Sequence, residues 1–244
     1  MICSVEKTYE NVEISEGVYM LSIMGKFNVK PGQFFMLKIG DKEPLLPRPI
    51  SVYDVATDKI SFLYQIVGEG TKLLSKLKGN DEIQLMGPLG NGFDVEKIKG
   101  NIAVVSGGIG IAPLIYLIKK LTDCKIDLYA GFRTVDYSVD TVSKYVNETY
   151  ISTESGDIGH KGYVTDLINP QKYNTVICCG PEIMMKKVVR SCNDVNVPVY
   201  VSMESHMACG IGACLVCTCK TVEGNKRTCK DGPVFLGKDL IFND

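Results

Sequence analysis

Four cysteines close to the C-terminus constrain what this chain can form more than any other feature of its sequence. Cys209, Cys214 and Cys217 follow the spacing C-x4-C-x2-C, and Cys229 comes after eleven intervening residues. Plant-type [2Fe–2S] clusters are ligated with the same initial spacing. Gly210 and Gly212 would let the backbone wrap closely and direct N–H groups at the sulfur atoms. The pattern therefore predicts a [2Fe–2S] cluster held by these four thiolates.

Two alternatives remain open for this segment: a four-cysteine zinc site, and thiols that are simply buried. Zinc sites commonly use two separate C-x2–4-C pairs, whereas the two short spacings here share Cys214. Cys219 follows Cys217 by two residues, and we interpret it as a bystander. The remaining isolated cysteines suit small positions in a hydrophobic core: Cys3, Cys124, Cys178 and Cys192.

The composition narrows the function classes. The 244 residues include ten cysteines, and the N-terminal sequence MICSVEKTYE has no apolar signal segment. Cysteines in such a chain usually bind metal or do redox work in the cytoplasm rather than form disulfides. Twenty-seven basic and 28 acidic residues give a net charge of −1, without the basic excess typical of nucleic-acid-binding proteins. We therefore expect a cytoplasmic protein that binds no nucleic acid.

The hydrophobic pattern divides the chain into three modules, residues 1–98, 99–203 and 204–244. In the first module, short apolar runs are separated by turn residues, which predicts an antiparallel β-barrel or sandwich. Its expected strands cover residues 18–23, 34–39, 50–55, 60–67 and 82–86. In the last module glycine and cysteine dominate and regular periodicity disappears, so we assign it to the cluster.

The middle module alternates buried strands with helical stretches, which predicts a mainly parallel α/β sheet. The expected strands cover residues 102–105, 126–130, 149–153, 175–179 and 199–203, with helices at 113–121 and 181–191. Residues 100–118 carry no charge and reach the length of a membrane helix. Because three glycines and Pro113 interrupt this stretch, a strand, a turn and a helix explain it better than a membrane span.

Two turns in the middle module are suited to binding a nucleotide. The first, with Gly107, Gly108 and Gly110, follows a strand and opens a helix, where free N–H groups and the helix dipole favour a pyrophosphate. The second, Cys179-Gly180-Pro181, lies at another switch from strand to helix, with Pro181 expected at the first helical position. Ligands bind at the carboxyl ends of the strands in open α/β sheets, so both turns should line one crevice. Taken alone, the first turn also suits a tight strand–helix connection.

The first module carries short polar motifs beside its expected strands. In R-P-I-S, an arginine and a serine separated by two residues can hold a diphosphate, the arginine through charge-assisted hydrogen bonds. A Gly-Thr pair opening a short helix at 72–77 offers a second anion site. The candidate cofactor-binding residues are Arg48, Pro49, Ile50, Ser51, Tyr64, Gln65, Ile66, Gly70 and Thr71. Taken alone, these motifs also suit ordinary turns and a surface arginine.

In this order, the elements resemble those of the ferredoxin–NADP reductase superfamily. RPIS (48–51) corresponds to its R-x-[YF]-S flavin motif, and GEGT (68–71) to its second flavin element. GGIGIAP (107–113) and CCGP (178–181) correspond to its two nucleotide turns. The cysteine segment, MESHMACGIGACLVCTCK followed by CKDGPVF, is similar to that of the electron transfer subunits of dihydroorotate dehydrogenase B. The resemblance covers essentially the whole chain, with Ile50 in place of an aromatic residue and Val216 in place of a glycine.

The resemblance implies FAD on the barrel and NAD on the α/β domain, with Cys179 beside the point of hydride transfer. A flavin can exchange hydrides with a nicotinamide and single electrons with an iron–sulfur cluster, so it would connect the two. The implied partner is an FMN-containing catalytic subunit that oxidises dihydroorotate to orotate in pyrimidine biosynthesis. Two copies of each chain would form a heterotetramer, with the cysteine segment facing the partner.

Three questions stay open at this point. A related electron transfer subunit, of a sulfide dehydrogenase or a ferredoxin-linked transhydrogenase, would share every cofactor and differ in its partner. A zinc-stabilised nucleotide-binding module would have no redox role. For the nucleotide, Arg133 could meet the 2′-phosphate of NADP, and no acidic residue directly ends the strand at 126–130; NAD is expected from the resemblance alone.

Overall fold

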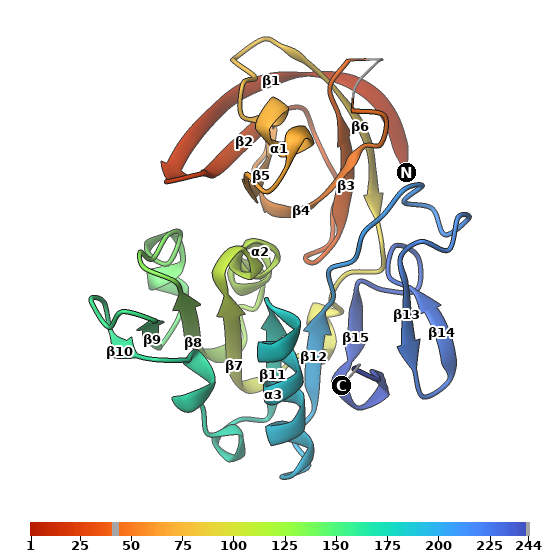
Figure 1. Ribbon diagram of the computed structural model, residues 1–244. Helices are drawn as coiled ribbons and strands as arrows, with labels where there is room; N and C mark the ends of the chain where they lie inside the picture. Colours follow the sequence, from red (N-terminus) through yellow and green to blue (C-terminus); the bar gives the residue numbers. More distant parts are fainter. Residues whose placement is uncertain (41–43, 243–244) are drawn as a thin grey trace.

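The N-terminal part of the chain forms a closed antiparallel barrel. The computed structural model describes residues 1–40 and 44–242. Within these residues, six strands close the barrel in the order β1-β2-β5-β4-β3-β6 (Figure 1). They are β1 (Ile2–Ser15), β2 (Val18–Met24), β3 (Phe34–Lys38), β4 (Arg48–Val55), β5 (Lys59–Gln65) and β6 (Glu82–Leu89). The expected antiparallel module is therefore confirmed, as a barrel rather than a sandwich.

Alternation along the strands builds the barrel core. On β3, Phe35 and Leu37 point inward and pack with the other core side chains, whereas Phe34 and Met36 face outward. Helix α1 (Glu69–Leu74) contributes Leu74 to the same core. This helix begins at Glu69 and not near residue 72 as predicted, because Gly68 already takes the extended N-cap conformation.

The second part is a seven-stranded sheet in the order β10-β9-β8-β7-β11-β12-β15. Its strands are β7 (Gly100–Gly107), β8 (Cys124–Phe132), β9 (Glu148–Thr153), β10 (His160–Lys161), β11 (Thr175–Cys179), β12 (Val199–Ser202) and β15 (Val234–Leu236). The described pairs are parallel except that of β12 with β15. Both faces are buried, which accounts for the continuous apolar runs of the central strands.

Helices cover the two faces of this sheet. Helix α2 (Ala112–Lys120) packs on one face and α3 (Glu182–Asn193) on the other. Pro181 is the N-cap of α3 and not its first helical residue, because its ψ of 139° is extended. Short 3-10 helices complete the connections: η1 (Val95–Lys97), η2 (Gly108–Ile111), η3 (Asp140–Tyr145), η4 (Val164–Asp166), η5 (Pro170–Lys172) and η6 (Gly237–Asp239). No helix in the described ranges has the length and apolar character to cross a bilayer.

Helix α2 also joins the sheet to the barrel. It lies between them in Figure 1 and packs against β4. Lys119 Nζ forms an ion pair with Asp54 Oδ2 at 2.7 Å, and the Tyr116 hydroxyl donates to the Val29 carbonyl oxygen at 3.4 Å. These contacts fix the barrel on the carboxyl-end side of the sheet.

The cysteine-rich segment contacts both parts. It contains the hairpin β13 (Thr218–Thr221) and β14 (Gly224–Arg227), and then returns as β15 to the edge of the sheet beside β12 (Figure 1). Its Gly232 carbonyl oxygen accepts a hydrogen bond from the Asn91 N–H of the segment after the barrel at 2.8 Å. The segment is therefore attached to both the barrel and the sheet.

Candidate functional site

The four cysteines of the predicted cluster lie in two pairs. The first pair is Cys209 and Cys214. The N–H groups of Ala213 and Cys214 donate to Cys209 Sγ at 3.3 and 3.4 Å. Burial raises the pKa of the Cys209 thiol, but the N–H groups of Cys214, Ile211 and Ala213 outweigh it and lower the pKa to about 6. A thiolate is the form that ligates metals, so this environment prepares Cys209 as a ligand.

The second pair is Cys217 and Cys229, each only 2% exposed. The Cys229 N–H donates to Cys217 Sγ at 3.5 Å. Burial, followed by the hydrogen bond with Cys217, raises the pKa of the Cys229 thiol to about 12. Among residues 1–40 and 44–242, no three His, Cys, Asp or Glu side chains gather in the manner of a single-ion site.

The cysteine loop, residues 209–217, lies directly on the barrel. Cys217 and Cys229 share a buried cluster with Phe34, Met36 and Leu89. Gly210 has a φ of +69°, and a Cβ atom there would come within 2.8 Å of the Met36 side chain, so glycine suits this close approach. On the same strand, β3, Met36 pairs with Pro49 and Phe34 with Ser51 of the barrel motif. Cys217, Cys229 and the barrel motif thus flank one strand.

The outer side of the cysteine loop exposes apolar side chains. Leu215 is 62% exposed and has a φ of +61°, a backbone conformation that is rare for residues other than glycine and asparagine. Val216 and Ile211 are also exposed, and so is Cys214. Exposed apolar groups that gather in one loop are typical of a surface that another protein covers.

A second candidate site is a cleft of about 1040 Å³ at the carboxyl ends of the sheet strands, bounded by the barrel. Gly107, Gly108 and Gly110 of the first predicted turn and Gly180 and Pro181 of the second line this cleft. The expectation that both turns line one crevice is therefore confirmed. The turns touch: a Cβ on Gly110 would lie 2.5 Å from the Cys179 carbonyl oxygen, and one on Gly180 would lie 2.8 Å from the Gly107 nitrogen.

Cys179 itself is fully buried at the end of β11. The described residues that line the cleft include its neighbours Gly180 and Pro181 but not Cys179. Burial raises the pKa of the Cys179 thiol well above its ordinary value, so the group is a neutral thiol. Its assignment to the point of hydride transfer stays a prediction.

In the barrel motif, the structure brings Arg48 and Gly70 together. A Cβ on Gly70 would lie 1.9 Å from Arg48 Nε, so the guanidinium lies against the first turn of α1. The guanidinium also donates to the Leu46 carbonyl oxygen. Thr71 caps the N-terminus of α1, because its hydroxyl accepts hydrogen bonds from the N–H groups of Val67 and Gly68 at 3.0 and 3.2 Å. Pro49, Ile50 and Ser51 continue the half-buried start of β4.

The other predicted barrel residues lie on or just after β5 and face different ways. Tyr64 is buried in the barrel core, where its hydroxyl donates to Asn11 Oδ1 at 3.1 Å, and burial raises the pKa of this phenol. Gln65 is exposed and lines the cleft beside the glycine turns. The Ile66 N–H is bound to the Gly17 carbonyl oxygen at 2.8 Å. Of these three predicted residues, Gln65 is the one that lines the large cleft.

The structure adds one cleft residue that sequence reasoning missed. Glu154 and Arg133 both line the cleft, and the Glu154 N–H donates to the Arg133 carbonyl oxygen at 3.2 Å. The sequence argument on NAD and NADP concerned only the end of the strand that precedes Arg133. Glu154 follows the neighbouring strand, β9, so an inspection of the next strand end would have found it.

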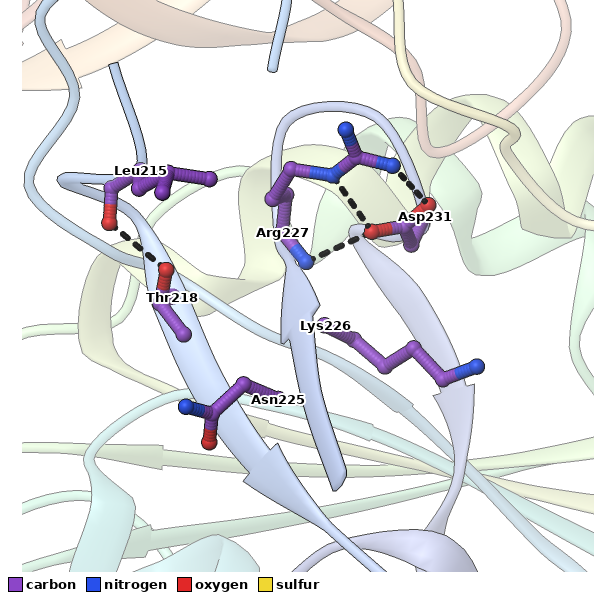
Figure 2. A pocket seen from close by; sticks show the side chains of 6 residues that line it. All are labelled: Leu215, Thr218, Asn225, Lys226, Arg227 and Asp231. Carbon is purple, nitrogen blue, oxygen red and sulfur yellow. Dashed lines mark hydrogen bonds and ion pairs between the residues drawn. The ribbon is translucent and has the colours of Figure 1, made fainter. Parts of the chain in front are cut away.

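A smaller pocket of about 410 Å³ lies beside the cysteine loop (Figure 2). Its lining residues are Leu215, Thr218, Asn225, Lys226, Arg227 and Asp231. Figure 2 shows Arg227 and Asp231 joined across it, with Nε and Nη2 of the arginine 2.9 and 3.0 Å from the two carboxylate oxygens. The Arg227 guanidinium lowers the pKa of Asp231 to about 2. Neither residue was predicted, because no motif includes them.

Comparisons with known proteins identify the family of the chain and of its cysteine-rich segment. Residues 204–241 match the family described as the iron–sulfur cluster binding domain of dihydroorotate dehydrogenase B. The chain is 62% identical over 241 residues to the dihydroorotate dehydrogenase B (NAD(+)) electron transfer subunit of Clostridium acetobutylicum, covering 99% of this chain and 98% of that protein. The corresponding subunit of Clostridium perfringens is 52% identical over 240 residues, with 97% of each chain covered.

Solved structures give the same fold. The NADH-dependent reduced ferredoxin–NADP oxidoreductase superimposes with a TM-score of 0.87 at 30% identity, covering 98% of this chain and 90% of that one. A ferredoxin–NADP+ reductase from Neisseria gonorrhoeae superimposes with a TM-score of 0.64 at 16% identity over 79% of this chain and 91% of its own. The second likeness concerns the fold alone.

Proposed function

This chain belongs to the family of electron transfer subunits of dihydroorotate dehydrogenase B, and from that premise we propose how its residues perform the function. The family function is electron transfer within an NAD-dependent oxidoreductase, on a ferredoxin–reductase-like fold with an iron–sulfur domain. The resemblance inferred from the sequence motifs is thereby confirmed. The comparisons favour this family over a subunit of a sulfide dehydrogenase or a transhydrogenase.

Cys209, Cys214, Cys217 and Cys229 are proposed as the ligands of a [2Fe–2S] cluster. Such a cluster needs four thiolates, which the two thiol pairs would supply. Structural zinc sites commonly use two separate short-spaced cysteine pairs, whereas the two short spacings here share Cys214. When bound, the cluster exchanges single electrons. The N–H groups aimed at Cys209 would stabilise its negative charge.

FAD is proposed to bind the barrel at residues 48–51 and 68–71. The Arg48 guanidinium and the Ser51 hydroxyl would hold the diphosphate, and Gly70 leaves the space that the guanidinium occupies. When bound, FAD exchanges hydrides with a nicotinamide and single electrons with a cluster. β3 would separate the flavin motif from the thiols by one strand, which suits electron transfer between the two.

NAD, as a diffusible substrate, is proposed to bind in the large cleft. The first glycine turn lines this cleft, and its backbone N–H groups would bind the pyrophosphate. Glu154 lies beside Arg133 in the cleft, where a carboxylate can accept a hydrogen bond from a ribose 2′-hydroxyl and repel a 2′-phosphate. Cys179 would lie close to the nicotinamide, because the residues that follow it, Gly180 and Pro181, line the cleft.

The partner is proposed to be an FMN-containing catalytic subunit that converts dihydroorotate to orotate in pyrimidine biosynthesis, in a heterotetramer with two copies of each chain. The exposed apolar side chains of Ile211, Leu215 and Val216 would pack on this partner, next to the exposed Cys214. All ten cysteines lie in the described part of the chain and are free thiols, which supports the cytoplasm as its location.

The observation that carries the proposal is the packing of Cys217 and Cys229, and of Gly210 in the cysteine loop, against the strand that also borders the flavin motif. An anaerobic visible spectrum of the purified protein, before and after NADH is added, tests it. We expect flavin bands and a broad cluster absorbance, both bleached by NADH. Flavin bands without the cluster absorbance, together with zinc in metal analysis, would overturn the assignment of the cysteines.

Nucleotide choice has a separate test. Replacing Glu154 by glutamine removes its charge and keeps its shape, so the preference for NADH over NADPH should fall by about 10- to 100-fold, the worth of one hydrogen bond to a charged group. Glu182→Gln, which removes another carboxylate from the cleft lining, is the matched control and should leave the ratio unchanged. Equal ratios in the wild type and Glu154→Gln would contradict the role given to Glu154.

A further inference from the structure

Arg227 is the hydrogen-bonding centre of the turn that carries Cys229, which we call the Cys229 turn, residues 227–232. The Arg227 carbonyl oxygen accepts N–H bonds from Lys230, Asp231 and Gly232 at 3.0, 2.7 and 3.3 Å. Its own N–H donates to Asp231 Oδ2 at 2.7 Å. The backbone of the Cys229 turn is therefore folded around this one residue.

The Arg227 side chain extends this role to the other three cysteines. Its Nε and Nη2 bind both oxygens of Asp231, as Figure 2 shows, and its Nη1 donates to the Gly212 carbonyl oxygen at 3.3 Å. Gly212 lies in the cysteine loop between Cys209 and Cys214. One guanidinium therefore connects the Cys229 turn with the loop that carries the first three thiols.

Close contacts between the two segments surround this connection. The Thr228 N–H donates to the Cys217 carbonyl oxygen at 3.0 Å, and the Cys229 N–H lies 3.5 Å from Cys217 Sγ. The position of Cys229 relative to Cys217 thus depends on how the turn is held against the loop. The Arg227 and Asp231 side chains are 32% and 28% exposed, so their ion pair is partly shielded from water.

We propose that Arg227 is a positioning residue of the iron–sulfur site, which fixes the Cys229 turn against the cysteine loop and sets the charge beside the second thiol pair. The inference rests on the proposed cluster. The planar guanidinium can bind Asp231 with two N–H groups and Gly212 with a third, which a lysine ammonium cannot reproduce. Asp231 balances the charge that Arg227 brings to the site.

This arrangement gives opposite electrostatic effects for the two partners. Reduction adds an electron to the cluster, so positive charge nearby favours the reduced form and raises its reduction potential. Asp231→Asn leaves the guanidinium uncompensated and should raise the potential. Arg227→Gln leaves the carboxylate uncompensated and should lower it. A residue with a purely structural role would not produce shifts of opposite sign.

The test uses the purified holoprotein and its variants, with two readouts besides activity. The first is the rate at which an iron chelator bleaches the cluster absorbance, which Arg227→Gln should raise by about 10- to 100-fold. The second is the midpoint potential from an anaerobic titration monitored by electron paramagnetic resonance. Arg227→Lys keeps the positive charge but loses the planar set of N–H donors. Its cluster absorbance should therefore bleach faster than that of the wild type, with little change in the midpoint potential.

Lys226→Gln is the matched control. Lys226 lies in the same pocket and is paired with Glu223 at 3.0 Å, so its removal changes the net charge equally without touching the Cys229 turn's connection to Gly212. Equal bleaching rates for Lys226→Gln and Arg227→Gln, or potential shifts of one sign in Arg227→Gln and Asp231→Asn, would overturn the inference. A wild-type protein without cluster absorbance would overturn the proposed function as well, so the two failures are distinguishable.

Discussion

Replacing Gly70 by alanine should strengthen the fold and weaken FAD binding at once. Gly70 lies in the first turn of α1, and its φ is outside the left-handed region, so alanine fits its backbone. The new Cβ would lie 1.9 Å from Arg48 Nε and 2.2 Å from Cζ. Ordinary contact begins at 3.4 Å, so the guanidinium must move by about 1.5 Å. A hydrogen bond tolerates only a few tenths of an ångström, so the guanidinium would lose its place at the diphosphate.

The two effects have different sizes. Alanine is favoured over glycine within a helix by about 0.5–1 kcal/mol, and the displaced group is the flexible end of Arg48 and not backbone. Loss of hydrogen bonds from a charged guanidinium costs about 1.5–3 kcal/mol, which corresponds to an increase of about 10- to 100-fold in the dissociation constant for FAD. The apoprotein should therefore be slightly more stable while its affinity for FAD falls.

Flavin fluorescence during titration of the apoprotein gives the affinity, and denaturant unfolding of the same apoprotein gives the stability. Arg48→Ala should show the same loss of affinity, and Gly70→Ala should add little in that background, because the group it displaces is already absent. Unchanged FAD affinity in Gly70→Ala, or an equal further loss in the Arg48→Ala background, would refute the reasoning.

Three other changes have expected outcomes. Cys214→Ser should retain FAD and should still oxidise NADH with an artificial acceptor, but it should no longer deliver electrons to the catalytic partner. Cys219→Ser, the control, should retain both NADH oxidation and electron delivery. Loss of FAD from the purified Cys214→Ser protein would count against this prediction. Removal of the metal should loosen residues 204–242, because site formation and local folding are coupled, and limited proteolysis that finds the same resistance as in the holoprotein would contradict it. Gly110→Ala should destabilise the protein by about 1–3 kcal/mol, since its Cβ would lie 2.5 Å from the Cys179 carbonyl oxygen; an unchanged thermal midpoint would exclude this clash.

The sequence predicts best those features whose cause is local. The central strands of the sheet are buried on both faces and leave continuous apolar runs, and the turns after them need glycine because their backbones touch, as at Gly110 and Gly180. The spacing of the four cysteines is equally local. These signals sufficed to predict the barrel, the sheet and the two turns that line one cleft, and to name the candidate ligands.

What the sequence missed depends on partners that are distant along the chain. β1 has exposed apolar residues such as Val5 and Tyr9 and no clear alternation, so its fourteen residues carry no strand signal. Glu154 joins the cleft through the pairing of β8 with β9. Arg227 meets Gly212 across fifteen positions of sequence, and only the folded turn brings them together. Such residues show no periodicity or motif.

Because the chain returns as β15 and pairs with β12, the cysteine segment is part of the sheet and not a module that can be removed without affecting it. A shortened chain that ends after β12 would lose the strand that covers this edge, leaving the backbone N–H and C=O groups of β12 that face β15 unpaired. Open strand edges of this kind recruit other chains and promote aggregation. Truncation should therefore cost solubility as well as redox function. Grafting this segment onto another reductase would require a host sheet with a free edge beside its barrel.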